Sequence, residues 1–66
     1  MNVVVNGKRH EIADGETVAA LLEQLGLEGR YTIVERNGEA VERAAYDRIE
    51  LEGGDQLVVA RPVAGG

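Results

Sequence analysis

The chain has 66 residues, a formal net charge of −5, a single histidine and no cysteine. This length fits one domain, and the residue inventory excludes disulfide bonds and a metal site built from cysteine and histidine. The seven scattered basic residues argue against nucleic acid as a partner, whereas an acidic surface suits a basic partner protein or simply keeps the chain soluble.

Hydrophobic residues make up 44% of the sequence, as in a folded protein, and aliphatic side chains must fill the core because Phe and Trp are absent. No apolar run approaches the roughly 20 residues that a transmembrane helix needs. The sequence also begins without the charged leader and long apolar block of a signal peptide. We therefore expect a cytoplasmic location and no membrane partner.

Residues 2–12 predict a β-hairpin. Asn2–Asn6 contains three consecutive valines, whose branched side chains fit a pleated strand. Gly7 can adopt the positive φ of a tight turn, and Arg9–Ile12 follows as a short returning strand. Ala13–Gly15 then connects the hairpin to the next element.

A single clear helix follows, marked by four aliphatic residues at positions i, i+3, i+4 and i+7: Val18, Leu21, Leu22 and Leu25. Either Thr17 or Asp14 can cap its start, because a short side-chain oxygen accepts a hydrogen bond from a free backbone amide. Gly26 lies where a left-handed residue ends many helices. The helix therefore presents one apolar stripe to a partner layer.

Three extended segments are predicted after the helix, at Thr32–Arg36, Glu39–Val41 and Gln56–Arg61. Asn37–Gly38 and Gly53–Asp55 have the composition of turns. Between these turns, residues 44–47 predict one helical turn, and residues 49–51 alternate apolar with charged side chains in a short extended piece. Pro62 ends the last strand because it has no amide hydrogen to donate.

This order of elements predicts an α+β fold, the β-grasp (ubiquitin-like) arrangement, with a mixed sheet of four to five strands packed on one main helix. The first and the last strand pair in parallel in this arrangement. Alternation with period two points five side chains at the helix: Val3, Val5, Val34, Leu57 and Val59. We expect residues 1–61 to form this domain and residues 62–66 to form a flexible C-terminal tail that ends in Gly-Gly.

The sequence contains no recognisable catalytic centre. Ser–His–Asp and Cys–His sets cannot be assembled, a glycine-rich phosphate loop is missing, and most carboxylates belong to a solvated face. His10 is interpreted as a surface or rim residue rather than a base or ligand, and Tyr31 and Tyr46 as core edges with a solvated hydroxyl. We therefore expect no catalytic, cofactor-binding or metal residue, and a chain that is not an enzyme.

The remaining candidate site is the sequence after the last strand: Val63, Ala64, Gly65 and Gly66. From Arg61 to the end the chain can extend by roughly 20 Å, at about 3.3–3.6 Å per residue, and glycines can pass a narrow channel. ATP can activate the Gly66 carboxylate as an acyl adenylate, and a sulfur nucleophile can then displace AMP to leave a thiocarboxylate. The absence of an internal thiol is consistent with this chemistry, and the plain alternative is a loose chain end.

Five stretches of the sequence resemble those of a known protein family: Met1–Gly7, Glu16–Leu22, Ile33–Val41, Gly54–Leu57 and Val63–Gly66. Through these stretches, and over essentially the whole chain, the sequence resembles the sulfur carrier proteins of thiamine biosynthesis, a ubiquitin-like family. The Gly-Gly end and the Gly-Asp pair before the last strand are shared by many carriers of this fold. Ile33–Asn37 and the short length point more narrowly to the thiamine branch.

The resemblance implies a role for Gly66 and a set of partners. In that family an E1-like adenylating enzyme, related to ubiquitin-activating proteins, uses ATP on the residue that corresponds to Gly66. Sulfur comes from cysteine through a cysteine desulfurase or another persulfide donor, and the thiocarboxylate gives it to thiazole synthase. The resemblance therefore implies a protein co-substrate that binds no cofactor of its own.

Three related functions remain open alternatives. Residues 61–66, with proline shortly before the Gly-Gly end, also resemble the end of the small subunit of molybdopterin synthase, whose members are usually longer. Sulfur carriers for tRNA thiolation and modifiers that form isopeptide bonds with lysines share the same activation chemistry. The shortness of the chain favours the thiamine branch.

The resemblance also favours a docking role for the sheet face that the helix leaves uncovered. Four apolar side chains of this face are expected to be partly exposed: Val4, Ile33, Val58 and Ala60. The alternative is a set of exposed apolar side chains that the fold merely tolerates.

Overall fold

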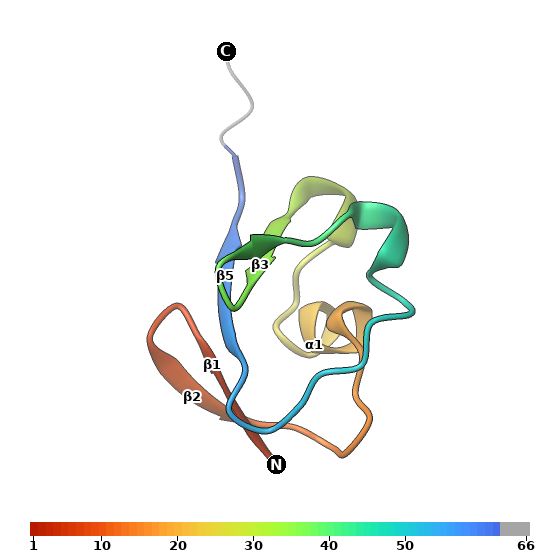
Figure 1. The fold of residues 1–66 in the computed structure, drawn as a ribbon. Helices are drawn as coiled ribbons and strands as arrows, with labels where there is room; N and C mark the ends of the chain where they lie inside the picture. Colours follow the sequence, from red (N-terminus) through yellow and green to blue (C-terminus); the bar gives the residue numbers. More distant parts are fainter. Residues whose placement is uncertain (63–66) are drawn as a thin grey trace.

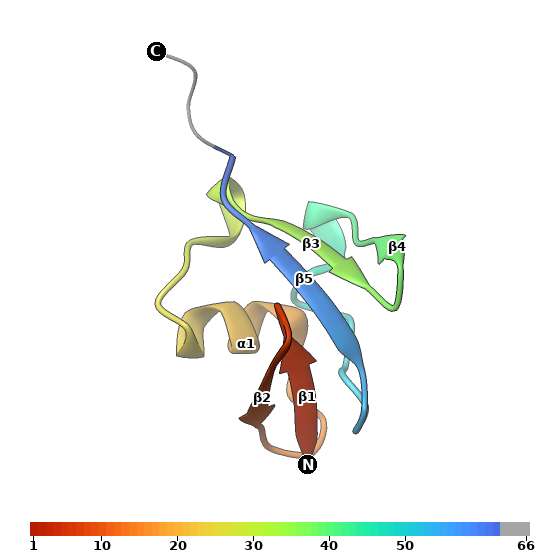
Figure 2. The same cartoon turned by 90° about the vertical axis from the view of Figure 1, so that its left-hand side faces the viewer.

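The order of strands places the last strand of the chain at the centre of the sheet. The computed structural model describes residues 1–62 (Figure 1). Its elements are, in chain order, β1 (Asn2–Val5), β2 (Lys8–Glu11), α1 (Val18–Gln24), the 3-10 turn η1 (Gly29–Tyr31), β3 (Ile33–Arg36), β4 (Glu39–Ala40), the 3-10 turn η2 (Arg43–Ala45) and β5 (Gln56–Ala60). Within residues 1–62, five strands form one sheet in the order β2-β1-β5-β3-β4 (Figure 2).

The sheet is mixed and has a helix on one side only. β1 runs parallel to β5, whereas β2 pairs with β1, and β3 with both β4 and β5, in antiparallel fashion. Figure 1 shows α1 lying against one face of the sheet, and Figure 2 shows the opposite face open. This is the β-grasp arrangement that the sequence predicts. No helix among the described residues is long and apolar enough to cross a membrane.

Both hairpin turns use an Asn-Gly pair in the left-handed backbone region. Asn6 and Gly7 have φ angles of 50° and 82°, and Asn37 and Gly38 have φ angles of 52° and 84°. Two consecutive residues at positive φ give a turn whose twist matches that of the flanking strands. The second turn lies where the sequence predicts it, whereas the first begins one residue earlier than predicted, at Asn6, so that β2 starts at Lys8.

The two ends of α1 are also formed as predicted. The side-chain oxygen of Thr17 accepts a hydrogen bond from the backbone amide three residues later at 3.1 Å, so Thr17 rather than Asp14 caps the helix. Gly26, just after the helix, has a φ of 75°. Three residues of the predicted stripe are buried: Val18, Leu21 and Leu22. The fourth, Leu25, is half-buried beyond the last helical residue.

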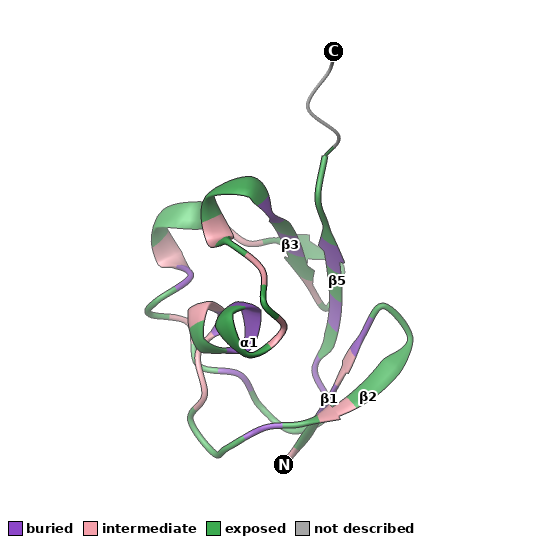
Figure 3. Cartoon of the chain, turned by 180° about the vertical axis from the view of Figure 1, so that it is seen from behind, coloured by how far each residue is buried: buried purple, intermediate pink, exposed green. Residues whose placement is uncertain are grey.

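The core lies between α1 and the inner face of the sheet (Figure 3). All five sheet positions predicted to face the helix are buried: Val3, Val5, Val34, Leu57 and Val59. Ile12, Tyr46 and Leu51, from outside the regular elements, complete the cluster. The Tyr46 hydroxyl donates a 2.8 Å hydrogen bond to the Thr32 carbonyl within the core. The expectation of a solvated hydroxyl is therefore wrong for Tyr46, because a buried phenol needs an internal acceptor.

Some element boundaries differ from the sequence prediction. The second 3-10 turn occupies Arg43–Ala45 instead of residues 44–47, and within residues 49–51 only Glu50 forms a bridge, an isolated antiparallel one with Thr17. η1 has no counterpart in the prediction, because a turn of three residues is too short for hydrophobic periodicity to reveal. None of these differences alters the layers of the fold.

Candidate functional site

The candidate site begins where β5 leaves the sheet. Arg61 and Pro62 follow Ala60, and both are exposed. Figure 2 shows this end of β5 and the N-terminus at opposite ends of the domain. The predicted site residues lie outside the described part of the chain: Val63, Ala64, Gly65 and Gly66. The structure describes the residues that precede them, Ala60, Arg61 and Pro62, which we call the base of the tail.

The C-terminal end of β5 is held by the side chain of Asn6, from the turn between β1 and β2. The backbone amide of Asn6 donates to the Leu57 carbonyl at 2.9 Å, in the ladder between the parallel strands. Beyond that bond, Asn6 Oδ1 accepts from the Val59 amide at 2.9 Å, and Nδ2 donates to the Val59 carbonyl at 3.0 Å. A side-chain amide therefore takes the place of strand backbone, with one donor and one acceptor. It fixes β5 up to the residue before Ala60.

The N-terminal end of β5 is held by the buried carboxylate of Asp55. This carboxylate accepts three hydrogen bonds, from Arg36 Nε at 2.8 Å, Asn37 Nδ2 at 3.0 Å and the Glu52 amide at 2.9 Å. Asn37 Oδ1 in turn accepts from the Gln56 amide at 2.9 Å. Burial raises the pKa of Asp55, but the three hydrogen bonds and the positive charge of Arg36 outweigh burial and lower it. Both ends of the central strand are thus anchored by polar side chains.

The open face of the sheet brings the four predicted apolar side chains to one surface: Val4, Ile33, Val58 and Ala60. Ile33 is 48% exposed and Val58 is 53% exposed, while Ala60 is exposed and Val4 half-buried. Ile33 lies directly opposite Ala60 in the antiparallel register, so this pair borders the start of the tail. Their exposure is as predicted, and their docking role stays a prediction.

The other titratable residues considered from the sequence do not form a reaction centre. His10 is half-buried on the edge strand β2, and Tyr31 is 55% exposed, with the Arg30 guanidinium 4.8 Å from its ring centroid. The described residues contain no group of three His, Cys, Asp or Glu side chains that can hold a metal ion.

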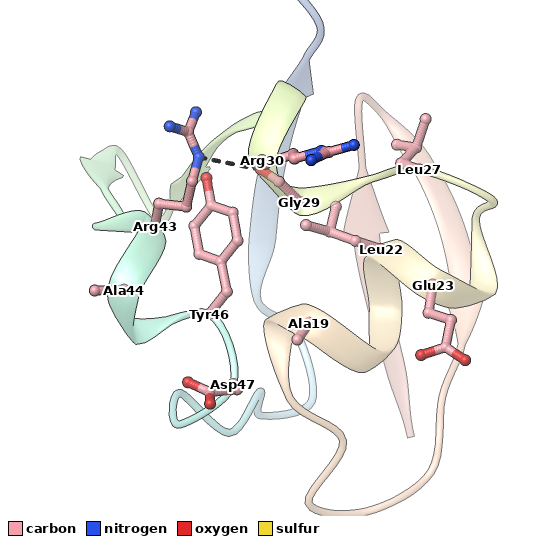
Figure 4. Close-up of a pocket in the computed structure, with 10 residues that line it drawn as sticks. All are labelled: Ala19, Leu22, Glu23, Leu27, Gly29, Arg30, Arg43, Ala44, Tyr46 and Asp47. Atoms are coloured by element: carbon pink, nitrogen blue, oxygen red, sulfur yellow. Dashed lines mark hydrogen bonds between the residues drawn. The ribbon is translucent and has the colours of Figure 1, made fainter.

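A hollow of about 540 Å³ lies between α1, η1 and η2 (Figure 4). Leu22 and Tyr46 line it, and at its edge Arg43 Nε donates to the Gly29 carbonyl at 3.2 Å. Charged side chains of both signs surround it: Glu23, Arg30, Arg43 and Asp47. Because the Tyr46 hydroxyl is engaged with Thr32, its lining residues offer no activated nucleophile with a neighbouring base.

The side chains of Asn6 and Asp55 both shape the site, although the sequence alone predicts no role for either. For Asp55 a signal exists, because the Gly-Asp pair before the last strand is part of the family resemblance. For Asn6 the sequence predicts only the end of the first strand, before the turn at Gly7, and nothing local predicts its bonds to Val59, which is 53 residues away. Such a contact follows only from the parallel pairing of β1 with β5.

Comparison with known sequences identifies the family. A model of the ThiS family matches residues 3–66. Over all 66 residues, the chain is 36% identical to a thiazole synthase of Paramagnetospirillum magneticum and 35% identical to one of Magnetococcus marinus. The chain spans 20% of the length of each of these two relatives.

Solved structures give the same result. The crystal structure of the thiamine biosynthesis protein ThiS from Geobacter metallireducens matches with a TM-score of 0.84 and 36% identity, and all of both chains is covered. An NMR structure of a thiamine biosynthesis protein from the same organism has a TM-score of 0.77 at 36% identity, covering all of this chain and 88% of that one. SAMP1 from Haloferax volcanii, at 23% identity and a TM-score of 0.62 over 98% and 97% of the two chains, shares the fold. With family model, sequence identity and fold in agreement, the chain belongs to the ThiS family.

Proposed function

We propose that this chain is a sulfur carrier of thiamine biosynthesis and that the Gly66 carboxylate is the group that carries the sulfur. The observation that supports this most strongly is the ThiS family match, which extends through Gly66. The fold adds a physical reason. Asn6 holds the central strand up to Val59, so the residues that follow start from a fixed position at one end of the domain.

The proposed chemistry activates the carboxylate before sulfur is attached. An oxygen of the Gly66 carboxylate attacks the α-phosphorus of ATP, pyrophosphate leaves, and an acyl adenylate forms. The terminal sulfur of a persulfide then attacks the acyl carbon, and AMP leaves. A second thiol cleaves the resulting S–S bond, which leaves a thiocarboxylate on Gly66 and a disulfide on the donor. The chain supplies the acyl group and its positioning, and partner enzymes supply the catalytic side chains.

The scheme needs three partners: an E1-like adenylating enzyme that uses ATP, a cysteine desulfurase or another persulfide donor, and thiazole synthase as the sulfur acceptor. Two relatives named thiazole synthase support the last of these, because a fifth of each matches this whole chain. A stretch that resembles a carrier within a synthase chain is expected if the carrier and the synthase act on each other. ATP and reduced thiols are both cytoplasmic, so we place this chemistry in the cytoplasm.

The experiment that tests the proposal measures the mass of the intact chain after incubation with ATP, the adenylating enzyme and a persulfide donor. We expect the mass to rise by the difference between sulfur and oxygen, and to stay unchanged when ATP is left out. Adding thiazole synthase and its other substrates should restore the original mass. An unchanged mass with an enzyme of proven activity would contradict the proposal, and attachment to lysines of other proteins would identify a modifier instead.

A substitution on the open face tests the predicted docking surface. Val58→Asp is expected to weaken binding to the adenylating enzyme at least about fivefold, because burying an unpaired carboxylate against an apolar surface costs on the order of 1 kcal/mol or more. The fold should survive, since Val58 is already half exposed. Calorimetric titration measures the affinity, and Ala44→Asp, at an exposed position of η2, introduces the same charge elsewhere. Equal affinities for the two variants would refute the docking role.

A further inference from the structure

A second surface adjoins the base of the tail, on the helix side of the sheet. It is a pocket of about 430 Å³ between the β1–β2 hairpin, the loop after α1 and the C-terminal half of β5. Figure 3 shows these three segments from behind. Three basic side chains line the pocket: Lys8, His10 and Arg61. We call it the basic pocket.

The strand register explains why two of these side chains face the helix side. In the antiparallel pair of β1 and β2, Lys8 lies opposite Val5, and His10 lies opposite Val3. Both valines are buried beneath α1, and residues paired across a ladder point to the same face. The basic pocket therefore lies on the face of the sheet opposite to Val58 and its apolar neighbours.

The basic pocket combines apolar walls with a charge opposite to that of the chain. Leu25, Leu27 and Val59 supply apolar surface, and the two leucines are only half-buried. The chain has 12 acidic residues against seven lysines and arginines, yet among residues 1–62 the lining of this pocket includes no acidic side chain. Glu28 lines a neighbouring hollow together with Arg61. The pocket is thus a local basic site on an acidic protein.

The length of the tail fixes what must come close to this pocket. Gly66 lies five positions after Arg61, so the acyl group can lie no more than about 20 Å from Arg61. An enzyme that holds Gly66 in its active site must therefore bring its own surface to the base of the tail. The groups around Arg61, including those of the basic pocket, then face that surface.

From this geometry we infer that the basic pocket docks an acidic segment of the adenylating enzyme, with an aliphatic side chain against the leucines and carboxylates beside Lys8 and Arg61. The inference rests on the proposed function, because it assumes that the adenylating enzyme receives Gly66. Charge complementarity identifies the occupant, since a basic surface on a protein of net charge −5 attracts an acidic partner where the rest of the chain repels it. The attraction also orients the carrier, so that its C-terminal tail approaches the enzyme first.

Charge reversal tests the inference. We expect Lys8→Glu to slow association with the adenylating enzyme about tenfold, and Lys8→Glu combined with Arg61→Glu to slow it further, because complementary charges act mainly on the association rate. Raising the salt concentration should slow the wild-type chain, whereas it should speed the double variant, because salt screens the repulsion between like charges. Arg48→Glu is the matched control. Arg48 is exposed and lies outside the basic pocket. Arg48→Glu changes the net charge by the same amount as Lys8→Glu, so the association rate of this variant should stay within about twofold of the wild-type rate.

Stopped-flow or surface-binding kinetics with the full chain and the intact enzyme provide the rates, and a thermal melt checks that each variant is folded. Lys8→Glu is the decisive variant, because Lys8 does not belong to the segment that enters the enzyme. If Lys8→Glu binds as fast as Arg48→Glu while the wild-type chain gains sulfur, the basic pocket is not a docking site although the carrier function stands. The docking site is equally refuted if the double variant associates slowly but a variant with Arg61→Glu alone associates just as slowly, because Lys8 then contributes nothing. If the wild-type chain neither binds the enzyme nor gains sulfur, both proposals fail.

Discussion

Removing Gly65 and Gly66 is expected to abolish thiocarboxylate formation while leaving the domain folded. The truncated chain ends at Ala64, which shortens the tail by about 7 Å, so its carboxylate stops short of the position that the enzyme is built to attack. Folding should be unaffected, because the core described above is made of residues between Val3 and Val59. The intact mass after incubation with ATP, enzyme and persulfide donor should equal the starting mass, and the melting temperature should match that of the full chain.

Two further variants test separately the length of the tail and the need for a glycine at its last position. Gly66→Ala keeps the length but adds a Cβ atom, so we expect slower sulfur transfer with some product still formed. One alanine added after Gly66 keeps the glycines but moves the carboxylate outward, and we expect no product. Sulfur on the truncated chain would show that the glycines are dispensable. That result would remove Gly66 from the mechanism.

Asp55→Asn is expected to destabilise the domain by about 2–4 kcal/mol, because it weakens a buried ion pair and leaves buried donors without a charged acceptor. The carboxylate of Asp55 is nearly fully buried and lies 2.8 Å from Arg36 Nε. In a domain of this size, such a loss lowers the melting temperature by roughly 10 °C or more. Urea titration and thermal melts measure the change.

Glu52→Gln is the control for this substitution. Glu52 approaches Arg36 to 3.8 Å, but its side chain is 83% exposed, so losing its charge should cost at most about 0.5 kcal/mol. The amide of Glu52, which donates to Asp55, is kept in this variant. Equal stabilities of the Asp55 and Glu52 variants would show that the buried network does not hold the start of β5.

The stabilising effect of Asp55 should also depend on pH. Its pKa is lowered in the folded state from the ordinary value of 3.8, so the carboxylate stabilises the fold above that value and loses its effect as pH falls through the folded pKa. The difference in unfolding free energy between wild type and Asp55→Asn should therefore be constant from pH 5 to pH 8 and shrink below about pH 4. A difference that stays the same at pH 2 would contradict this assignment.

The sequence predicts most of the fold because the informative patterns are local. β1 and β5 each contain a run of branched and aliphatic residues that is typical of a strand, in which successive side chains point to opposite faces. The stripe of α1 repeats within two turns, so each pattern can be found within one element. The same patterns predict which side chains face the helix and which, such as Ile33 and Val58, remain exposed. The role of Gly66 stays a prediction, made from its position in the sequence and from the family resemblance.

The polar contacts around β5 could not be predicted in this way. Asn6 meets Val59 and Asp55 meets Arg36 only after β1, β3 and β5 are assembled, and hydrophobic periodicity carries no information about hydrogen-bond partners. The burial of Tyr46 has the same origin, because its hydroxyl reaches a carbonyl of residue 32 across the core. The contacts that the sequence could not predict are therefore those between residues that are distant in sequence.

The bond between Asn6 and Val59 sets a depth for any active site that works on this protein. Gly66 lies seven positions after Val59, so the acyl carbon can lie at most about 25 Å from the residue that Asn6 holds. On its other side β5 pairs with β3 as far as Ala60, so without the Asn6 side chain this end of β5 would be held from one side only, with its last bond to β1 at Leu57. In the proposed function, one asparagine in a hairpin turn thereby helps to fix the radius within which an enzyme must place its catalytic atoms.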